Sequence, residues 1–126
     1  MPYTAVVLDE ASRAKILIHV RIPDNFNVIA HHMTVDLQPS AKSMAKDMIG
    51  QSVSMLVTTV GTGYNSDGSL SIIALGVVTE APSKNTRKHI TVALDPRFAK
   101  PKDSNNINNW TNIAPFTVTG EVQEVK

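Results

Sequence analysis

Apolar and polar residues alternate in blocks along the chain, and the pattern predicts a strand followed by a helix at its start. Residues 3–8 form a short apolar run that is typical of a buried strand. Residues 10–20 combine Ala, Ile and Leu with other good helix formers. Asp9 is placed to cap this helix, which must end before Pro23.

A second strand and a second helix are expected next. Residues 26–37 predict a long strand. Pro39 and Ser40 are typical of a helix start, so a short helix is expected over about residues 41–49. Gly50 tolerates a positive φ and can end it.

The rest of the chain predicts strands. Residues 53–60 and 70–78 are rich in β-branched residues and flank a Gly-rich stretch, 61–68, which predicts a hairpin. A long polar stretch, residues 95–112, is expected to be a functional or disordered loop. Residues 116–125 alternate apolar and polar positions as a half-exposed strand does. The expected fold class is α+β, with antiparallel sheet and two helices on its outer faces.

Length and composition narrow the class of protein. A chain of 126 residues is expected to form one domain, 1–126. The net charge of +1 provides no overall field to recruit long nucleic acid, and the absence of Cys excludes thiolate chemistry. Neither a signal peptide nor an apolar run of ~18 residues is seen, so no membrane contact and a cytoplasmic location are expected.

One short pattern occurs twice. The order His, apolar, Thr, Val, any residue, Leu is found at residues 32–37 and again at residues 89–94. Side chains alternate between the two faces of a strand, so each His shares a face with the Thr two positions on: His32 with Thr34, and His89 with Thr91. The opposite, core-facing set is expected to be Met33, Val35, Leu37, Ile90, Val92 and Leu94.

The repeated pattern carries a specific chemistry. If the two strands border one groove, two imidazoles and two hydroxyls converge there. Imidazole titrates near neutral pH and can donate or accept a proton, while a Thr hydroxyl can hydrogen-bond a phosphate oxygen. The set therefore predicts a site for a phosphodiester, with His32 and His89 as the catalytic pair and Thr34 and Thr91 as substrate-binding residues.

Other residues could complete the site. Arg87 has the same strand parity as His89 and is placed to reach a phosphate, whereas Lys88 points the other way. Trp110, Tyr64 and Phe26 could each stack on a base, with Trp110 the best placed and packing the alternative for all three.

Two further histidines are expected to be structural. His19 falls at the end of the first helix, and His31 shares parity with the core face of its strand. A metal site would need a third ligand, and Asp36 is the only nearby carboxylate of suitable parity, so no metal or other cofactor is expected.

The paired His-x-Thr pattern resembles that of the two-histidine (2H) phosphoesterase superfamily. The opening, Tyr3-Thr4-Ala5-Val6-Val7-Leu8-Asp9 followed by Ser12-Arg13, is similar to the first strand and helix of its tRNA-ligase-type cyclic phosphodiesterase branch, and small viral members are also similar. The resemblance implies a compact bilobal fold with the motif strands side by side at the floor of a central groove. It also implies metal-independent hydrolysis in which one His is the general base and the other the general acid, in an order the sequence leaves open.

Three functions follow as hypotheses. The first is a phosphodiesterase acting on a cyclic nucleotide phosphate, either a 2′,3′-cyclic RNA end or a cyclic mono-, di- or oligonucleotide signal, with viral counter-defence as one setting. The second is a catalytically inactive module that sequesters such a nucleotide or RNA end, and the third is a metal-dependent hydrolase. The expected partner is a small nucleotide or RNA end rather than an extended nucleic acid, bound by a monomer or weak homo-oligomer.

Overall fold

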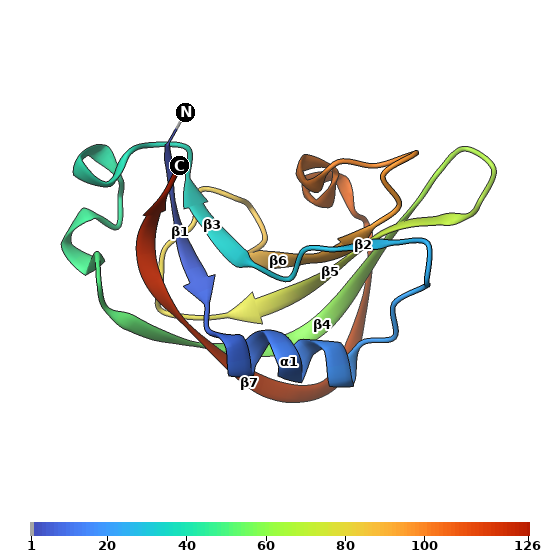
Figure 1. Cartoon of the computed structure of the whole chain (residues 1–126), viewed down its shortest axis with the longest axis horizontal. Coiled ribbons are helices and arrows are strands. Elements are labelled where there is room, and N and C mark those ends of the chain that lie inside the picture. The colour runs from blue at the N-terminus through green and yellow to red at the C-terminus, as the bar shows by residue number, and fades with distance from the viewer. Residues whose placement is uncertain (1) are drawn as a thin grey trace.

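The computed structural model describes residues 2–126, in which seven strands form one antiparallel sheet that curls strongly (Figure 1). The order across the sheet is β2-β6-β5-β4-β7-β1-β3. The strands are β1 (Tyr3–Leu8), β2 (Asn27–Val28), β3 (His32–Asp36), β4 (Ser52–Tyr64), β5 (Leu70–Val78), β6 (His89–Leu94) and β7 (Asn109–Val125). The fold is therefore α+β with an antiparallel sheet, as predicted, although the described residues form one sheet and show no division into two lobes.

The helix α1 (Glu10–His19) is the one substantial helix of the described residues, and it forms where the sequence predicts it. The Asp9 carboxylate accepts a hydrogen bond from the backbone N–H of Ser12 at 2.7 Å, which satisfies a donor of the first turn. Ile16 is fully buried where α1 lies against β7. At the other end, the ring of His19 stacks on Phe116. His19 therefore packs on a residue of β7, which is neither of the two motif strands.

The second predicted helix, over residues 41–49, is wrong. Two short 3₁₀ helices, η1 (Ser40–Lys42) and η2 (Lys46–Met48), take its place. Asp36 accepts hydrogen bonds from the Ser43 hydroxyl at 3.1 Å and the Met44 backbone N–H at 2.9 Å. These contacts hold Ser43 and Met44 against the end of β3 and compete with the backbone hydrogen bonds that a continuous helix needs. Gly50 does adopt the expected positive φ, at 86°.

The single strand predicted over residues 26–37 is also wrong, because the chain crosses there from one side of the sheet to the other. β2 pairs with β6, whereas β3 pairs with β1. At the crossing Ala30 has a φ of 40°, and its N–H lies 3.1 Å from the carbonyl of Thr91 in β6. One residue later, the carbonyl of His31 accepts from Leu8 of β1. The crossing segment, residues 29–31, thus links the two sides of the curled sheet.

Arg13 of α1 holds the crossing segment. Its Nε donates to the carbonyl of Ala30 at 2.9 Å, and its Nη2 donates to the carbonyl of Ile29 at 3.3 Å. A residue with positive φ is uncommon outside Gly, Asn and Asp, so the break needs such external contacts. A helix residue therefore fixes the point at which β3 begins.

The hairpin of β4 and β5 is confirmed, but β4 continues through the Gly-rich stretch that predicts a turn. Gly61 and Gly63 are strand residues paired with Ala74 and Ile72, and the connection is only residues 65–69. A Cβ on Gly61 would lie 2.6 Å from the ring of Trp110, its partner on β7. Glycine is thus needed here to let the indole lie on the sheet.

The core is mainly on one face of the sheet and contains four of the six motif residues expected there. Met33, Val35, Ile90 and Val92 are all fully buried. Leu37 is an exception, 78% exposed, because β3 ends at Asp36.

Leu94 is the other exception. It is buried, but in a second, smaller cluster with Ile72, Ala74, Ala99 and Ile107. A bulge between β5 and β6, at the step from Ile73 to Ala74, changes the side to which the end of β6 points.

The long polar stretch is more ordered than predicted. Within residues 95–112 the chain forms the 3₁₀ helix η3 (Pro101–Asn106) and then the first part of β7, which begins at Asn109 rather than residue 116. In the part of the chain that the structure describes, no helix is long and apolar enough to cross a bilayer.

Candidate active site between the two His-x-Thr strands

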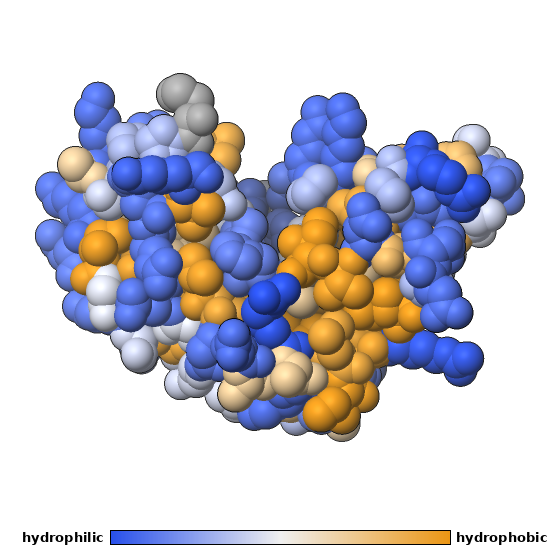
Figure 2. Space-filling view, in the orientation of Figure 1, coloured by the Kyte–Doolittle hydropathy of each residue, from blue (hydrophilic) through white to orange (hydrophobic). Residues whose placement is uncertain are grey.

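The curl of the sheet brings the two motif strands into contact although they are not hydrogen-bonded neighbours. All four motif side chains, His32 and Thr34 from β3 and His89 and Thr91 from β6, line one cavity of about 460 Å³. Its other walls come from β1, from the segment before β6 and from η3. In Figure 2 the surface is hollowed between β3 and η3, two of the elements that border this cavity. The structure therefore places together the four residues that the sequence pattern predicts to share a site.

The segment before β6 is fastened to β3. The Ser83 hydroxyl donates to the carbonyl of Thr34 at 2.8 Å, and the backbone N–H of Lys84 donates to the carbonyl of Val35 at 2.7 Å. These bonds hold Lys84 and Asn85 at the cavity wall between the two motifs. An exposed lysine, which belongs to neither motif, thereby borders the cavity.

His32 is held in a partly buried environment that favours its neutral form. Burial, with smaller contributions from the charges of His31 and His89, lowers the pKa of His32 to about 4. Its Nδ1 lies 3.0 Å from Nδ1 of His31. Its Nε2 lies 3.5 Å from the hydroxyl of Tyr3, a long contact, and burial raises the pKa of that phenol so that it stays protonated.

His89 has a defined ring orientation. It is 8% exposed, and its Nδ1 donates to the backbone carbonyl of Arg87 at 2.8 Å. Because a carbonyl can only accept, Nδ1 carries the proton and Nε2 is the atom whose protonation can change. His89 can therefore exchange a proton with a bound molecule through Nε2.

The two threonines differ in their surroundings. The Thr91 hydroxyl lies 2.7 Å from the hydroxyl of Ser104, a buried residue of η3. If Ser104 donates, the Thr91 hydrogen is free for a ligand. Thr34 is half-buried on β3 and its hydroxyl borders the same cavity.

The other four residues considered for the site lie elsewhere. Arg87 and Trp110 line a second, adjoining cavity of about 580 Å³ rather than the one with the four motif side chains. Tyr64 is 54% exposed at the end of β4, where its hydroxyl bonds Thr62, and it lines neither cavity. Phe26 is 8% exposed and belongs to the core, so it is not available to stack on a base.

Several cavity residues were not predicted for the site. Their signals in the sequence are weak, because they come from three separate parts of the chain, namely β1, the segment before β6 and η3: Tyr3, Lys84, Asn85, Pro101, Lys102 and Asn105. Only the polar run that leads into the second motif, residues 84–88, hinted at Lys84 and Asn85. The expectation that His31 faces the core is wrong: it precedes β3, is half-buried and turns its ring to His32.

The carboxylates near the cavity are few and already occupied. Asp36 reaches its wall but is itself buried and accepts hydrogen bonds from Ser43 and Met44. Among residues 2–126 no group of three or more His, Cys, Asp or Glu is arranged to hold a metal ion. The chemistry available at this site is therefore that of imidazole, hydroxyl, amide and ammonium groups.

Comparison with known proteins adds no relative, since no family model, no curated protein and no solved structure matches the chain.

Proposed function

We propose that this chain is a phosphodiesterase of the 2H kind, which hydrolyses a cyclic phosphodiester of a nucleotide without a metal ion. The observation that carries the proposal is that both His-x-Thr pairs, from strands far apart in the sequence, line one cavity. The 2H-like character of the fold, with the motif strands at the floor of a groove, is part of the same proposal.

The different surroundings of the two histidines support opposite roles. Because burial and the neighbouring His31 and His89 lower the pKa of His32 to about 4, this ring is neutral near pH 7 and can accept a proton, so we assign it as the general base. The Nδ1–H of His89 is held by the carbonyl of Arg87, which leaves Nε2 to deliver a proton as the general acid. A phosphate anion between the rings would raise the pKa of His32 and so strengthen it as a base.

The proposed step is a balanced hydrolysis. His32 removes a proton from water while the water oxygen forms a bond to phosphorus. The bond from phosphorus to the ribose oxygen breaks, and that oxygen takes the proton from His89 Nε2. Thr34 and Thr91 donate to the non-bridging oxygens, and the Lys84 ammonium, at the wall of the same cavity, offsets their charge.

One observation favours the alternative of a nucleotide-binding module without turnover. A base with a pKa of about 4 is weak in the free protein, so binding without hydrolysis is the outcome if the substrate does not raise it.

The deciding experiment is incubation of the protein with a panel of cyclic mono-, di- and oligonucleotides and 2′,3′-cyclic RNA ends, with products identified by mass. We expect one class to gain a single water, equally with and without EDTA, and the folded His32→Ala, His89→Ala double variant to be inactive. Binding without any product would favour the sequestering module. Loss of turnover with EDTA, restored by one divalent ion, would favour the metal-dependent hydrolase.

A further inference from the structure

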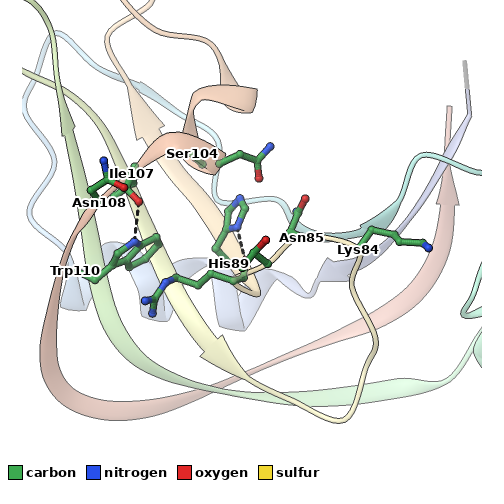
Figure 3. A pocket seen from close by; sticks show the side chains of 10 residues that line it. Lys84, Asn85, His89, Ser104, Ile107, Asn108 and Trp110 are labelled. Atoms are coloured by element: carbon green, nitrogen blue, oxygen red, sulfur yellow. Dashed lines mark hydrogen bonds between the residues drawn. The ribbon is translucent and has the colours of Figure 1, made fainter.

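The second cavity adjoins the candidate active site at His89. Four residues, Lys84, Asn85, His89 and Asn105, line both cavities. Figure 3 shows His89 standing between Trp110 on one side and Asn85 and Lys84 on the other. A phosphate held at His89 would therefore have room for a substituent on each side.

In the second cavity, the guanidinium of Arg87 lies over the ring of Trp110. One face of the Trp110 ring lies against the backbone at Gly61, where a Cβ would be only 2.6 Å from the indole. The guanidinium carbon of Arg87 is 4.6 Å from the centroid of this ring. Because the backbone at Gly61 covers one face of the indole, Arg87 must lie on the other face. Trp110 Nε1 donates to the carbonyl of Ile107 at 3.0 Å, which fixes the indole (Figure 3).

This arrangement changes which side chain can receive a base. Both faces of Trp110 are covered, so the predicted stacking of a base directly on Trp110 is not compatible with this arrangement. The Arg87 guanidinium, which lies over the indole, is instead the planar group that can stack on a base, and its N–H groups can bind phosphate.

The second cavity is lined by groups that suit a negatively charged ligand with hydrogen-bonding groups, such as a nucleotide. Its lining contains Lys84 and Arg87, the amides of Asn85, Asn105 and Asn108, and no carboxylate. In residues 2–126 the one ion pair is between Arg97 and Asp95, so neither cation of this cavity is neutralised by an acidic side chain there. The amides can hydrogen-bond the edge of a base.

We infer that the second cavity is a subsite for a second nucleoside, so that the substrate is a cyclic di- or oligonucleotide, whose phosphodiester joins two nucleosides. This inference rests on the proposed function and narrows it. A 2′,3′-cyclic phosphate on a mononucleotide has a nucleoside on one side only and would leave the Arg87 surface empty.

Binding can be measured separately from turnover. Trp110 is the only Trp of the chain, so intrinsic fluorescence reports on this cavity. The full chain carrying His32→Ala is titrated with a cyclic diadenosine dinucleotide, adenosine 2′,3′-cyclic phosphate and inorganic phosphate. We expect the dinucleotide to change the Trp110 emission and to bind about 10- to 100-fold more tightly than the cyclic mononucleotide.

Arg87→Ala in the same background should remove most of that preference while changing the affinity for the cyclic mononucleotide less than about twofold. Arg87→Lys, which keeps the charge but not the planar group, should retain only part of it. Lys88→Ala is the matched control, because Lys88 is the adjacent cation but its Nζ donates to the carbonyl of Thr79 and it lines neither cavity.

Two results would overturn the subsite. One is equal affinity of the His32→Ala protein for the dinucleotide and the cyclic mononucleotide; the other is a preference that Arg87→Ala leaves intact. Its failure is distinct from that of the proposed function: if the native protein cleaves a cyclic mononucleotide as efficiently as a dinucleotide, the phosphodiesterase stands and the subsite does not.

Discussion

His31 and His32 are hydrogen-bonded to each other through their Nδ1 atoms, 3.0 Å apart. One ring must donate and the other accept, so the pair cannot be fully protonated and keep this bond. If Nδ1 of His32 donates, its Nε2 carries the lone pair that a general base needs. The residue beside the first motif therefore has a direct means of setting the tautomer of the motif histidine.

Replacing His31 should change the titration of His32. His31→Ala removes a nearby charge and exposes the neighbouring ring to water, and both effects should raise the pKa of His32 from about 4 toward its ordinary value. The acidic limb of the pH dependence of kcat should move to higher pH in the same variant. His31→Asn, whose carbonyl can still accept from His32, is the conservative comparison. Imidazole titration by NMR measures the shift, and an unchanged pKa in His31→Ala would remove His31 from this role.

The lowered pKa of His32 also predicts how stability depends on pH. The unfolded imidazole titrates near 6.5 and the folded one at about 4, so between these values the unfolded chain binds more protons. The free energy of unfolding should therefore fall as the pH drops through this window, by about 2 kcal/mol between about pH 7 and pH 5 from this group alone.

Urea unfolding of the native protein and of His32→Asn at both pH values isolates this contribution, since the other titrating groups are common to the two proteins. We expect the fall to be smaller in His32→Asn by about that amount. Equal falls in the two proteins would mean that His32 titrates normally in the folded state.

The sequence predicts that the four motif side chains lie together because a strand has a period of two, which fixes the shared face of His32 with Thr34 and of His89 with Thr91. It fails where a tertiary contact decides. The helix expected over residues 41–49 does not form, because the Asp36 carboxylate binds the backbone in the middle of the segment. The strand expected over residues 26–37 is interrupted where Arg13 holds the crossing segment. Leu94 points to the other face of the sheet because of a bulge that the local sequence pattern does not predict.

The same limit applies to the residues around the site. Trp110 was a reasonable base-stacking candidate by type, but its ring faces depend on Gly61 and Arg87, which come from two other parts of the chain. Tyr3 meets His32 only because β1 pairs with β3, a tertiary contact that the local pattern does not contain.

Arg13 should be needed to place β3. Its guanidinium donates to two backbone carbonyls of the crossing segment, and bonds of this kind from a charged group contribute about 1.5–3 kcal/mol. Arg13→Ala should lower the free energy of unfolding by that order. It should also lower kcat, because His32 follows directly after the segment. The shape of the pH profile of kcat should stay the same, because Arg13 does not exchange a proton in the reaction.

The matched control for Arg13 is Lys15→Ala. Lys15 is on the same helix and also donates to a backbone carbonyl, that of Thr117 at 2.8 Å, but on the exposed side of β7 away from the cavity. It should change stability by less than about 1 kcal/mol and leave kcat unaltered. A folded Arg13→Ala protein with native kcat would show that other contacts position β3.

The strongest test of the site concerns its two histidines acting in one step. If His32 and His89 are base and acid, removing either should lower kcat on the order of 10²–10⁴-fold, and removing both should cost far less than the product of the two single losses. Thr34→Ala and Thr91→Ala should be milder, because each removes one hydrogen bond to a charged phosphate, worth about 1.5–3 kcal/mol, and leaves proton transfer possible. All four variants should fold, since Met33, Val35, Ile90 and Val92 provide the packing of these strands.

His19→Ala serves as the control for loss of an imidazole, because its ring stacks on Phe116 outside the cavity. It should keep the native kcat even if the melting temperature falls. Losses that multiply in the double variant would mean that the two histidines act in separate steps or on separate sites. Full turnover by a folded His32→Ala, His89→Ala protein would sink the assignment, because no other imidazole in residues 2–126 lines the cavity where the two motifs meet.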